Sequence, residues 1–186
     1  METVPQHLAL VGMAGVGKSA VARRLAVLLD RPCRDLDAMV VAARDGQSVA
    51  EIFAEVGEQG FRDLESAVLA ECLASDEPVV VATGGGVVER PANRELLAAG
   101  AGVVWLTAPD DVLVERLRSS SVRRPLLEGD LEANLEALRS RREDWYRELA
   151  DVEVTVGDHD LSRTVSDVLA AVRKRWPVVM PAQGAS

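Results

Sequence analysis

The feature that most constrains the fold is an eight-residue motif at positions 12–19, which reads GMAGVGKS. It fits the phosphate-loop pattern G-x-x-x-x-G-K-[ST] at every fixed position. An apolar stretch at residues 7–11 precedes the motif and predicts a strand, and the apolar periodicity of residues 18–30 predicts a helix. Because a strand, this loop and a helix form the context that the motif requires, we predict a nucleotide-phosphate site here.

The residues of this loop have separate expected roles. Its glycines let backbone N–H groups point at phosphate oxygens, and the N-terminus of the following helix adds its dipole. Lys18 brings a charge to the β- and γ-phosphates, and the Ser19 hydroxyl is a hard oxygen ligand suited to Mg²⁺. The ATP-binding residues expected in this motif are Gly12, Gly15, Val16, Gly17, Lys18, Ser19 and Ala20.

Short strands alternate with helices along the rest of the chain. Further strands are predicted at 33–37, 78–82, 102–107 and 152–156, and further helices at 38–44, 48–55, 58–74, 91–99, 110–118, 131–149 and 161–175. This alternation predicts a three-layer α/β/α fold around a five-stranded parallel sheet. We expect the P-loop NTPase fold in the form of the nucleoside monophosphate kinases, with strand order 2-3-1-4-5. A helical insert at 38–74 and a lid at 119–130 interrupt the alternation, and such inserts hold ligands.

Length and charge narrow the class of protein. A chain of 186 residues suits one domain, which we place at residues 1–176, followed by a disordered tail at 177–186. The 30 acidic residues outnumber the 21 basic ones, and a net charge of −9 argues against a nucleic-acid partner. We find no signal sequence, no membrane-spanning run and no metal spacing around Cys33 and Cys72. We therefore expect a cytoplasmic, monomeric protein.

Two absences in the sequence favour a small-molecule kinase over a GTPase or a motor. The guanine-specifying pattern Asn-Lys-x-Asp does not occur. The strand expected at 78–82 continues into Thr83 and the glycines 84–86, without the terminal Asp that is usual in NTP hydrolases.

The acceptor site is expected near two aspartates, Asp35 and Asp37, at the end of the second strand. Residues two apart in a strand point to one side, so one carboxylate could act on hydrated Mg²⁺ and the other could accept a proton from an acceptor hydroxyl. The alternative is a polar strand end that caps the next helix. In the insert, Ser48 and Glu51 predict a capping box, and Arg62 and Glu65 are spaced to pair on a helix.

At this point the sequence resembles the shikimate kinase family. That family's insert reads G-x-S-[IV]-x-[ED]-I-F-x-x-x-G-E-x-x-F-R-x-x-E, and residues 46–65 match it throughout. Further matches are the triple glycine at 84–86, the Arg-Pro-Leu-Leu run at 124–127, and an arginine at 142 four residues before a tyrosine. They occur in the family's order over roughly residues 7–150.

The resemblance implies a transferase that phosphorylates shikimate with ATP and Mg²⁺, a step of chorismate and aromatic amino acid biosynthesis. Asp37 would hold the acceptor hydroxyl and act as its base, with Lys18 and Arg124 completing the catalytic set. Asp35 would act through Mg²⁺-bound water. The acceptor-binding residues implied are Asp37, Phe53, Phe61, Arg62, Gly84, Gly85, Gly86 and Arg142, with the two arginines gripping the carboxylate.

In the expected lid, Arg124 is preferred over Arg123 as the arginine that closes over ATP, because Pro125 matches the family's position. Arg116 or Arg118 could stack on adenine, and the sequence does not choose between them. The stretch from 37 to 46 is one residue longer than the family's spacing, which requires a bulge or a longer loop. The adenine loop expected around 156–161 matches weakly, and His159 in it needs no catalytic role.

Two other classes of function stay open at the level of sequence. One is a related kinase that acts on gluconate or a nucleoside monophosphate. The other is a nucleotide-binding regulatory protein without catalysis, against which the intact Lys18, Ser19, Asp35 and Asp37 argue.

Overall fold

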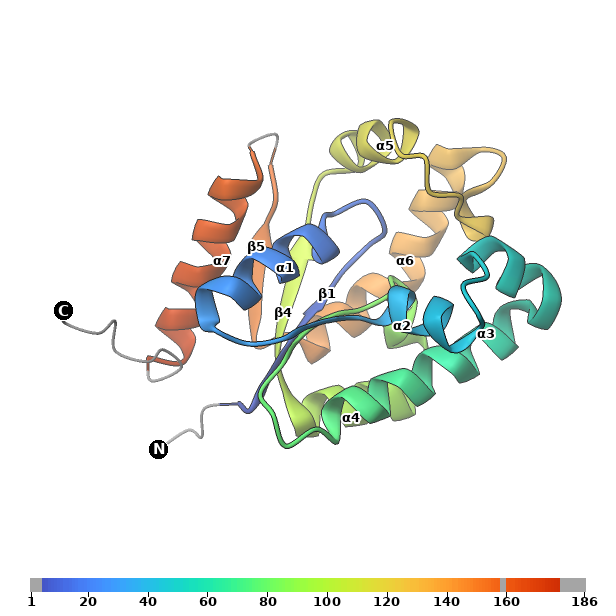
Figure 1. Cartoon of the computed structure of the whole chain (residues 1–186). Coiled ribbons are helices and arrows are strands. Elements are labelled where there is room, and N and C mark those ends of the chain that lie inside the picture. Colours follow the sequence, from blue (N-terminus) through green and yellow to red (C-terminus); the bar gives the residue numbers. More distant parts are fainter. Residues whose placement is uncertain (1–4, 158–159, 178–186) are drawn as a thin grey trace.

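The computed structural model describes residues 5–157 and 160–177. Five parallel strands form one sheet in the order β2-β3-β1-β4-β5 (Figure 1), which confirms the predicted order. The strands are β1 (His7–Val11), β2 (Cys33–Asp35), β3 (Val80–Ala82), β4 (Ala101–Thr107) and β5 (Val152–Thr155). The central strands β1 and β3 are buried at every position, as expected for a parallel sheet covered on both faces.

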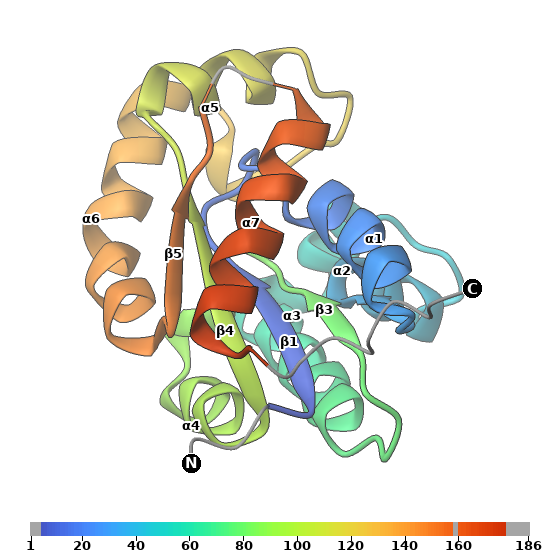
Figure 2. The same ribbon diagram turned by 90° about the vertical axis from the view of Figure 1, so that its left-hand side faces the viewer.

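Helices cover both faces of the sheet (Figure 2). Helices α1 (Lys18–Leu29) and α7 (Leu161–Arg175) pack together on one face. Helices α3 (Val49–Leu73), α4 (Pro91–Gly100) and α6 (Leu131–Leu149) lie on the other, and α5 (Asp110–Arg118) packs against α6. Two 3-10 turns that the sequence did not predict, η1 (Val87–Glu89) and η2 (Pro125–Leu127), follow the triple glycine and the lid arginines.

The second strand is shorter than predicted. It ends at Asp35, and α2 (Leu36–Ala43) begins at once, so Asp37 lies in the first turn of a helix. The Asp35 side chain accepts a hydrogen bond from the backbone N–H of Ala38 at 3.4 Å and acts as the N-cap. The expectation that both carboxylates share one side of a strand is therefore wrong, because the capping role of Asp35 starts the helix two residues early.

The helical insert contains one kink, at Gly57. Its φ of 70° and ψ of 178° break α3 between the two helices predicted there, and glycine adopts this left-handed φ without steric cost. At the N-terminus of α3, the side chains of Ser48 and Glu51 form the predicted capping box. Before it, the chain turns through Asp45 and Gly46, which have φ values of 53° and 82°, in the loop between α2 and α3.

The insert and the 119–130 segment meet at the carboxyl-terminal edge of the sheet (Figure 1). Within the described ranges, no helix is long and apolar enough to cross a bilayer. The tail expected at 177–186 lies outside the described residues except for Pro177, and so does His159 of the expected adenine loop.

Candidate active site

The phosphate loop depends on glycine at specific points. Gly12, Gly15 and Gly17 have φ values of 139°, 83° and 101°, a region that favours glycine. A Cβ atom on Gly12 would lie 2.2 Å from the backbone oxygen of Leu106 on β4, so the loop can pass this close to the strand only without a side chain. Gly17 is the N-cap of α1, and the N-terminus of this helix therefore faces into the loop.

Lys18 lies inside the loop with only 8% of its surface exposed. Its Nζ donates hydrogen bonds to the backbone oxygens of Gly12 and Met13 at 2.8 and 2.9 Å. Burial lowers the pKa of this ammonium to about 8, although the neighbouring Asp37 and Asp35 act in the opposite direction. Both aspartates are therefore electrostatic neighbours of the lysine that is expected to bind phosphate.

Asp37 lies at the mouth of a cavity of about 100 Å³, where its side chain is open to solvent. The enclosing walls raise the pKa of its carboxyl group, Asp35 raises it further, and Lys18, Arg124 and Arg62 act against the rise. A carboxylate with a raised pKa is a better proton acceptor, so this environment suits a general base.

Two buried arginines enter the same cavity from different helices. Arg62 of α3 and Arg142 of α6 are only 5% and 3% exposed. Arg62 donates through Nη1 to Glu65 at 2.8 Å, and Arg142 donates through Nε to Glu89 at 2.7 Å. Nη2 of Arg142 is buried and has no hydrogen-bond partner among the described residues. An unpaired, buried guanidinium nitrogen at a cavity wall is suited to an anionic ligand.

The triple glycine is required by close packing around these charges. A Cβ on Gly84 would lie 2.2 Å from Oε1 of Glu65, and one on Gly86 would lie 2.1 Å from Nη2 of Arg62. A Cβ on Gly85 would lie 3.3 Å from the backbone nitrogen of Ala14 in the phosphate loop. The glycines thus join the phosphate loop to the arginine cluster without filling the space between them.

The remaining walls are apolar or belong to the 119–130 segment. The rings of Phe53 and Phe61 lie 4.6 Å apart, centre to centre, on either side of the Gly57 kink. Arg124 lines the cavity and donates to the backbone oxygen of Val122 at 3.1 Å. Arg123 instead pairs with Glu128 and is mostly exposed, so the structure places the preferred arginine, Arg124, at the site.

The structure brings every residue predicted to bind the acceptor to this one cavity. It is lined by Asp37, Phe53, Phe61, Arg62, Gly84, Gly85, Gly86, Arg124 and Arg142. Ser19 and Ala20 lie in the first turn of α1, and Asp35 caps α2 beside Lys18 and Asp37. The roles of these residues stay predictions.

Several residues of the site were missed by sequence reasoning or left undecided. Glu89, which accepts a hydrogen bond from Arg142, belongs to no motif that the sequence analysis used. Tyr146 was noted only for its spacing from Arg142, and its hydroxyl group donates to the backbone oxygen of Gly85. Arg116 donates to backbone oxygens of Val16 in the phosphate loop and of Gly157. Because Arg118 points away to Glu132, Arg116 is the one of the two beside the nucleotide loop.

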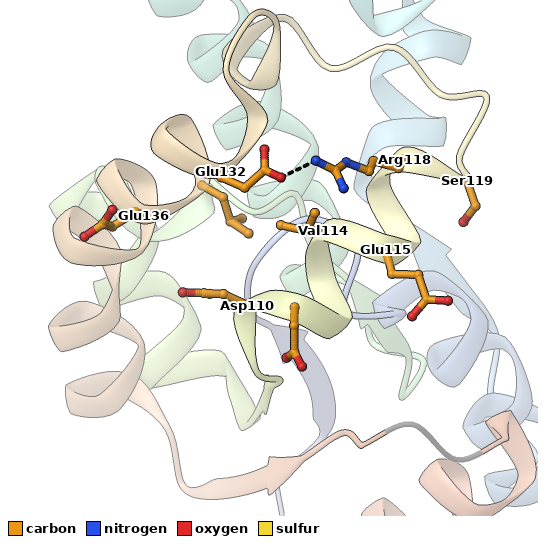
Figure 3. A pocket seen from close by; sticks show the side chains of 9 residues that line it. Asp110, Val114, Glu115, Arg118, Ser119, Glu132 and Glu136 are labelled. Carbon is orange, nitrogen blue, oxygen red and sulfur yellow. Dashed lines mark hydrogen bonds and ion pairs between the residues drawn. The ribbon is translucent and has the colours of Figure 1, made fainter.

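A larger cavity, of about 830 Å³, lies away from this chemistry between α5 and α6 (Figure 3). Its rim is acidic, with Asp110, Glu115 and Glu136, and the Arg118–Glu132 ion pair spans it. It shares no lining residue with the arginine-lined cavity, and Arg118, the adenine candidate that pairs with Glu132, lies on its wall.

The sheet order, the phosphate loop and the adjoining arginine-lined cavity define a class of protein, the phosphate-loop kinases of small molecules. The family model for shikimate kinase matches residues 14–173. The chain therefore belongs to the shikimate kinase family.

Individual relatives agree with this assignment. The shikimate kinase of Symbiobacterium thermophilum is 41% identical over 171 residues, covering 91% of this chain and 97% of the relative. That of Halorhodospira halophila is 48% identical over 151 residues, covering 81% and 84%. The solved shikimate kinase from Acinetobacter baumannii, in complex with shikimate, superimposes with a TM-score of 0.86 at 33% identity, covering 94% of this chain and 96% of that one. A gluconokinase from Sinorhizobium meliloti, 21% identical with a TM-score of 0.58, shares the fold alone.

Proposed function

We propose that this protein transfers the γ-phosphoryl group of ATP to the 3-hydroxyl group of shikimate, giving shikimate 3-phosphate and ADP. The observation that carries the proposal is the convergence of Arg62, Arg142 and Asp37 on one cavity beside the phosphate loop. Family membership supports the same reaction. The acceptor carries both groups that such a cavity requires, a carboxylate for the arginines and a hydroxyl for the aspartate.

The arginines account for binding and orientation. A guanidinium group can form two parallel hydrogen bonds to a carboxylate, which fixes the direction of the acceptor as well as its position. With the carboxylate held at Arg62 and Arg142, the ring lies against the wall that Phe53 and Phe61 form together, and a ring hydroxyl reaches Asp37. Holding that hydroxyl in line with the γ-phosphate is one of the two main contributions that a kinase site makes, together with charge stabilisation.

Charge neutralisation comes from the nucleotide side. Lys18 and the N–H groups of the phosphate loop meet the β- and γ-phosphates, and Arg124 approaches the transferred group from the 119–130 segment. Asp37 accepts the proton of the attacking hydroxyl, a role suited to the direction of its pKa shift.

Mg²⁺ fits the oxygen donors that the chain offers. This ion keeps several waters and binds through one or two protein oxygens together with substrate phosphates. Ser19 would supply one such oxygen, and Asp35, beside Lys18, would act through a bound water. When bound, Mg²⁺ neutralises charge on the phosphates. A cytoplasmic location and a monomeric state remain predictions from the sequence.

The deciding experiment is an ADP-release assay with ATP and Mg²⁺, in which shikimate, gluconate and AMP are offered in turn. We expect turnover with shikimate and at most trace turnover with the other two. Turnover with gluconate or AMP but not shikimate would reject the proposed acceptor, and no turnover with any acceptor despite ATP binding would favour the regulatory alternative.

A further inference from the structure

Glu89 occupies the centre of the arginine cluster, yet no motif or role considered above includes it. It ends η1, where its backbone N–H donates to Gly86 O at 3.0 Å, so the turn that follows the triple glycine also fixes its position. Its side chain, 16% exposed, accepts a hydrogen bond from Nε of Arg142 at 2.7 Å and another from Arg141. Its second oxygen lies 3.7 Å from Nε of Arg62.

The geometry of these contacts leaves the outer part of the Arg142 guanidinium group for a ligand, whereas Nη1 of Arg62 donates to Glu65. Glu89 approaches both Arg62 and Arg142 at Nε, the nitrogen nearest the aliphatic stem. The terminal nitrogens of Arg142 are left: Nη2 has no hydrogen-bond partner among the described residues, and Nη1 lies 3.5 Å from the position of a Cβ on Gly85. Gly85 and Arg142 both line the cavity, whereas Glu89 does not. Glu89 therefore contacts Arg142 at Nε, on the side away from the cavity.

The charges around Glu89 also indicate that it stabilises the arginine pair. Two buried guanidinium groups near one cavity repel each other, and a carboxylate between them offsets that repulsion. Burial acts to raise the pKa of Glu89, but Arg142 above all, then Arg141 and Arg62, hold that pKa below its usual value. Glu89 is therefore ionised at neutral pH, and its negative charge offsets the repulsion between the two arginines.

We propose that Glu89 is a positioning residue that orients Arg62 and Arg142 for the carboxylate of the acceptor. This inference rests on the proposed function and assigns the specificity of its acceptor site to a third side chain. Arginine side chains lose much rotamer freedom when they grip a ligand, and prior fixation by Glu89 removes part of that cost from acceptor binding. A negative charge near a bound anion also repels it, and the proposal holds that orientation outweighs this repulsion.

The test compares Glu89→Ala and Glu89→Gln with wild type, with Glu95→Gln on the exposed face of α4 as the matched control. Kinetic constants are measured for shikimate and for ATP, and shikimate affinity is measured directly by calorimetry without nucleotide. We expect Glu89→Ala to raise the KM and Kd for shikimate about tenfold or more, the scale of one charge-assisted hydrogen bond. The KM for ATP and the kcat should stay within about threefold of wild type.

Glu89→Gln separates orientation from charge, because its amide oxygen can still accept the hydrogen bond from Arg142. We expect it to recover part of the shikimate affinity that Glu89→Ala loses. Shikimate constants within about twofold of wild type in both variants would overturn the proposal, and so would tighter shikimate binding in Glu89→Gln, which would make repulsion the larger effect. If Glu89→Ala does not fold, Glu89→Gln decides alone. Absence of turnover in the wild-type enzyme would instead refute the proposed function.

Discussion

Replacing Gly86 with alanine tests whether the arginine cluster depends on the missing side chain of the triple glycine. The backbone of Gly86, with φ near −94°, accepts alanine without strain, so the effect comes from contact alone. The new Cβ would lie 2.1 Å from Nη2 of Arg62, where ordinary contacts begin at about 3.4 Å. The guanidinium group must therefore move by at least about 1.3 Å.

The size of the effect follows from what that movement breaks. Arg62 is held by its 2.8 Å hydrogen bond to Glu65. A shift of this size moves the Arg62 guanidinium group out of hydrogen-bonding range of either Glu65 or the bound carboxylate. A hydrogen bond to a charged group contributes about 1.5–3 kcal/mol, or about 10- to 100-fold in affinity. We expect Gly86→Ala to raise the KM for shikimate by that factor, while the KM for ATP changes little.

Initial-rate kinetics with shikimate varied at saturating ATP measures this effect, and thermal unfolding checks that the variant folds. Gly100→Ala is the matched control, because a Cβ on this α4 glycine meets the side chain of Leu73 at an ordinary 3.5 Å. An unchanged shikimate KM in folded Gly86→Ala would refute the reasoning, since Arg62 could then move without consequence for the acceptor.

Three further predictions concern the charged groups of the site. Asp37→Asn should leave ATP binding nearly unchanged and lower kcat by about 10²- to 10⁴-fold, the usual contribution of a general base; near-normal turnover would remove Asp37 from that role. Arg62→Lys should raise the shikimate KM about tenfold or more because lysine cannot form the bidentate pair, and an unchanged KM would place Arg62 outside the site. ATP affinity of the free enzyme should fall as pH rises through about 8, where Lys18 loses its proton, and calorimetry would contradict this if affinity were flat from about pH 7 to about pH 9.5. Because the unfolded chain keeps that proton up to about 10.5, Lys18 makes the free energy of unfolding rise with pH between these two pKa values.

Local patterns were sufficient to predict most of the helices and strands. The strand order was predicted correctly, and the phosphate loop lies between β1 and α1 as its motif requires. The error at Asp35 and Asp37 arose from competition between two local signals, a polar strand end and a helix N-cap. The cap prevailed because Asp35 satisfies the backbone N–H of Ala38, an interaction that no period-2 pattern reveals.

The charged cluster was less accessible to sequence reasoning because its contacts join distant segments. Glu89 and Arg142 are separated by 53 positions, and nothing in either neighbourhood indicates the other. The i,i+3 spacing of Arg62 and Glu65 did predict their pairing, but not that both would be buried beneath a glycine. Tertiary packing decides whether a guanidinium group is exposed or buried. The burial of these arginines, which local sequence does not indicate, is what makes the cavity suited to an anion.

The kink at Gly57 separates two tasks of the acceptor pocket along a single helix. Val49 and Phe53 precede it and belong to the apolar wall, which Phe61 completes from the other side of the kink. Arg62 and Glu65 also follow the kink, where they form the buried ion pair that presents the guanidinium group to an anion. Protein engineers can therefore redesign the first part for a bulkier or smaller ring while the charge-bearing part keeps its contacts. Natural selection has the same freedom, and one glycine makes shape and charge separately adjustable in this chain.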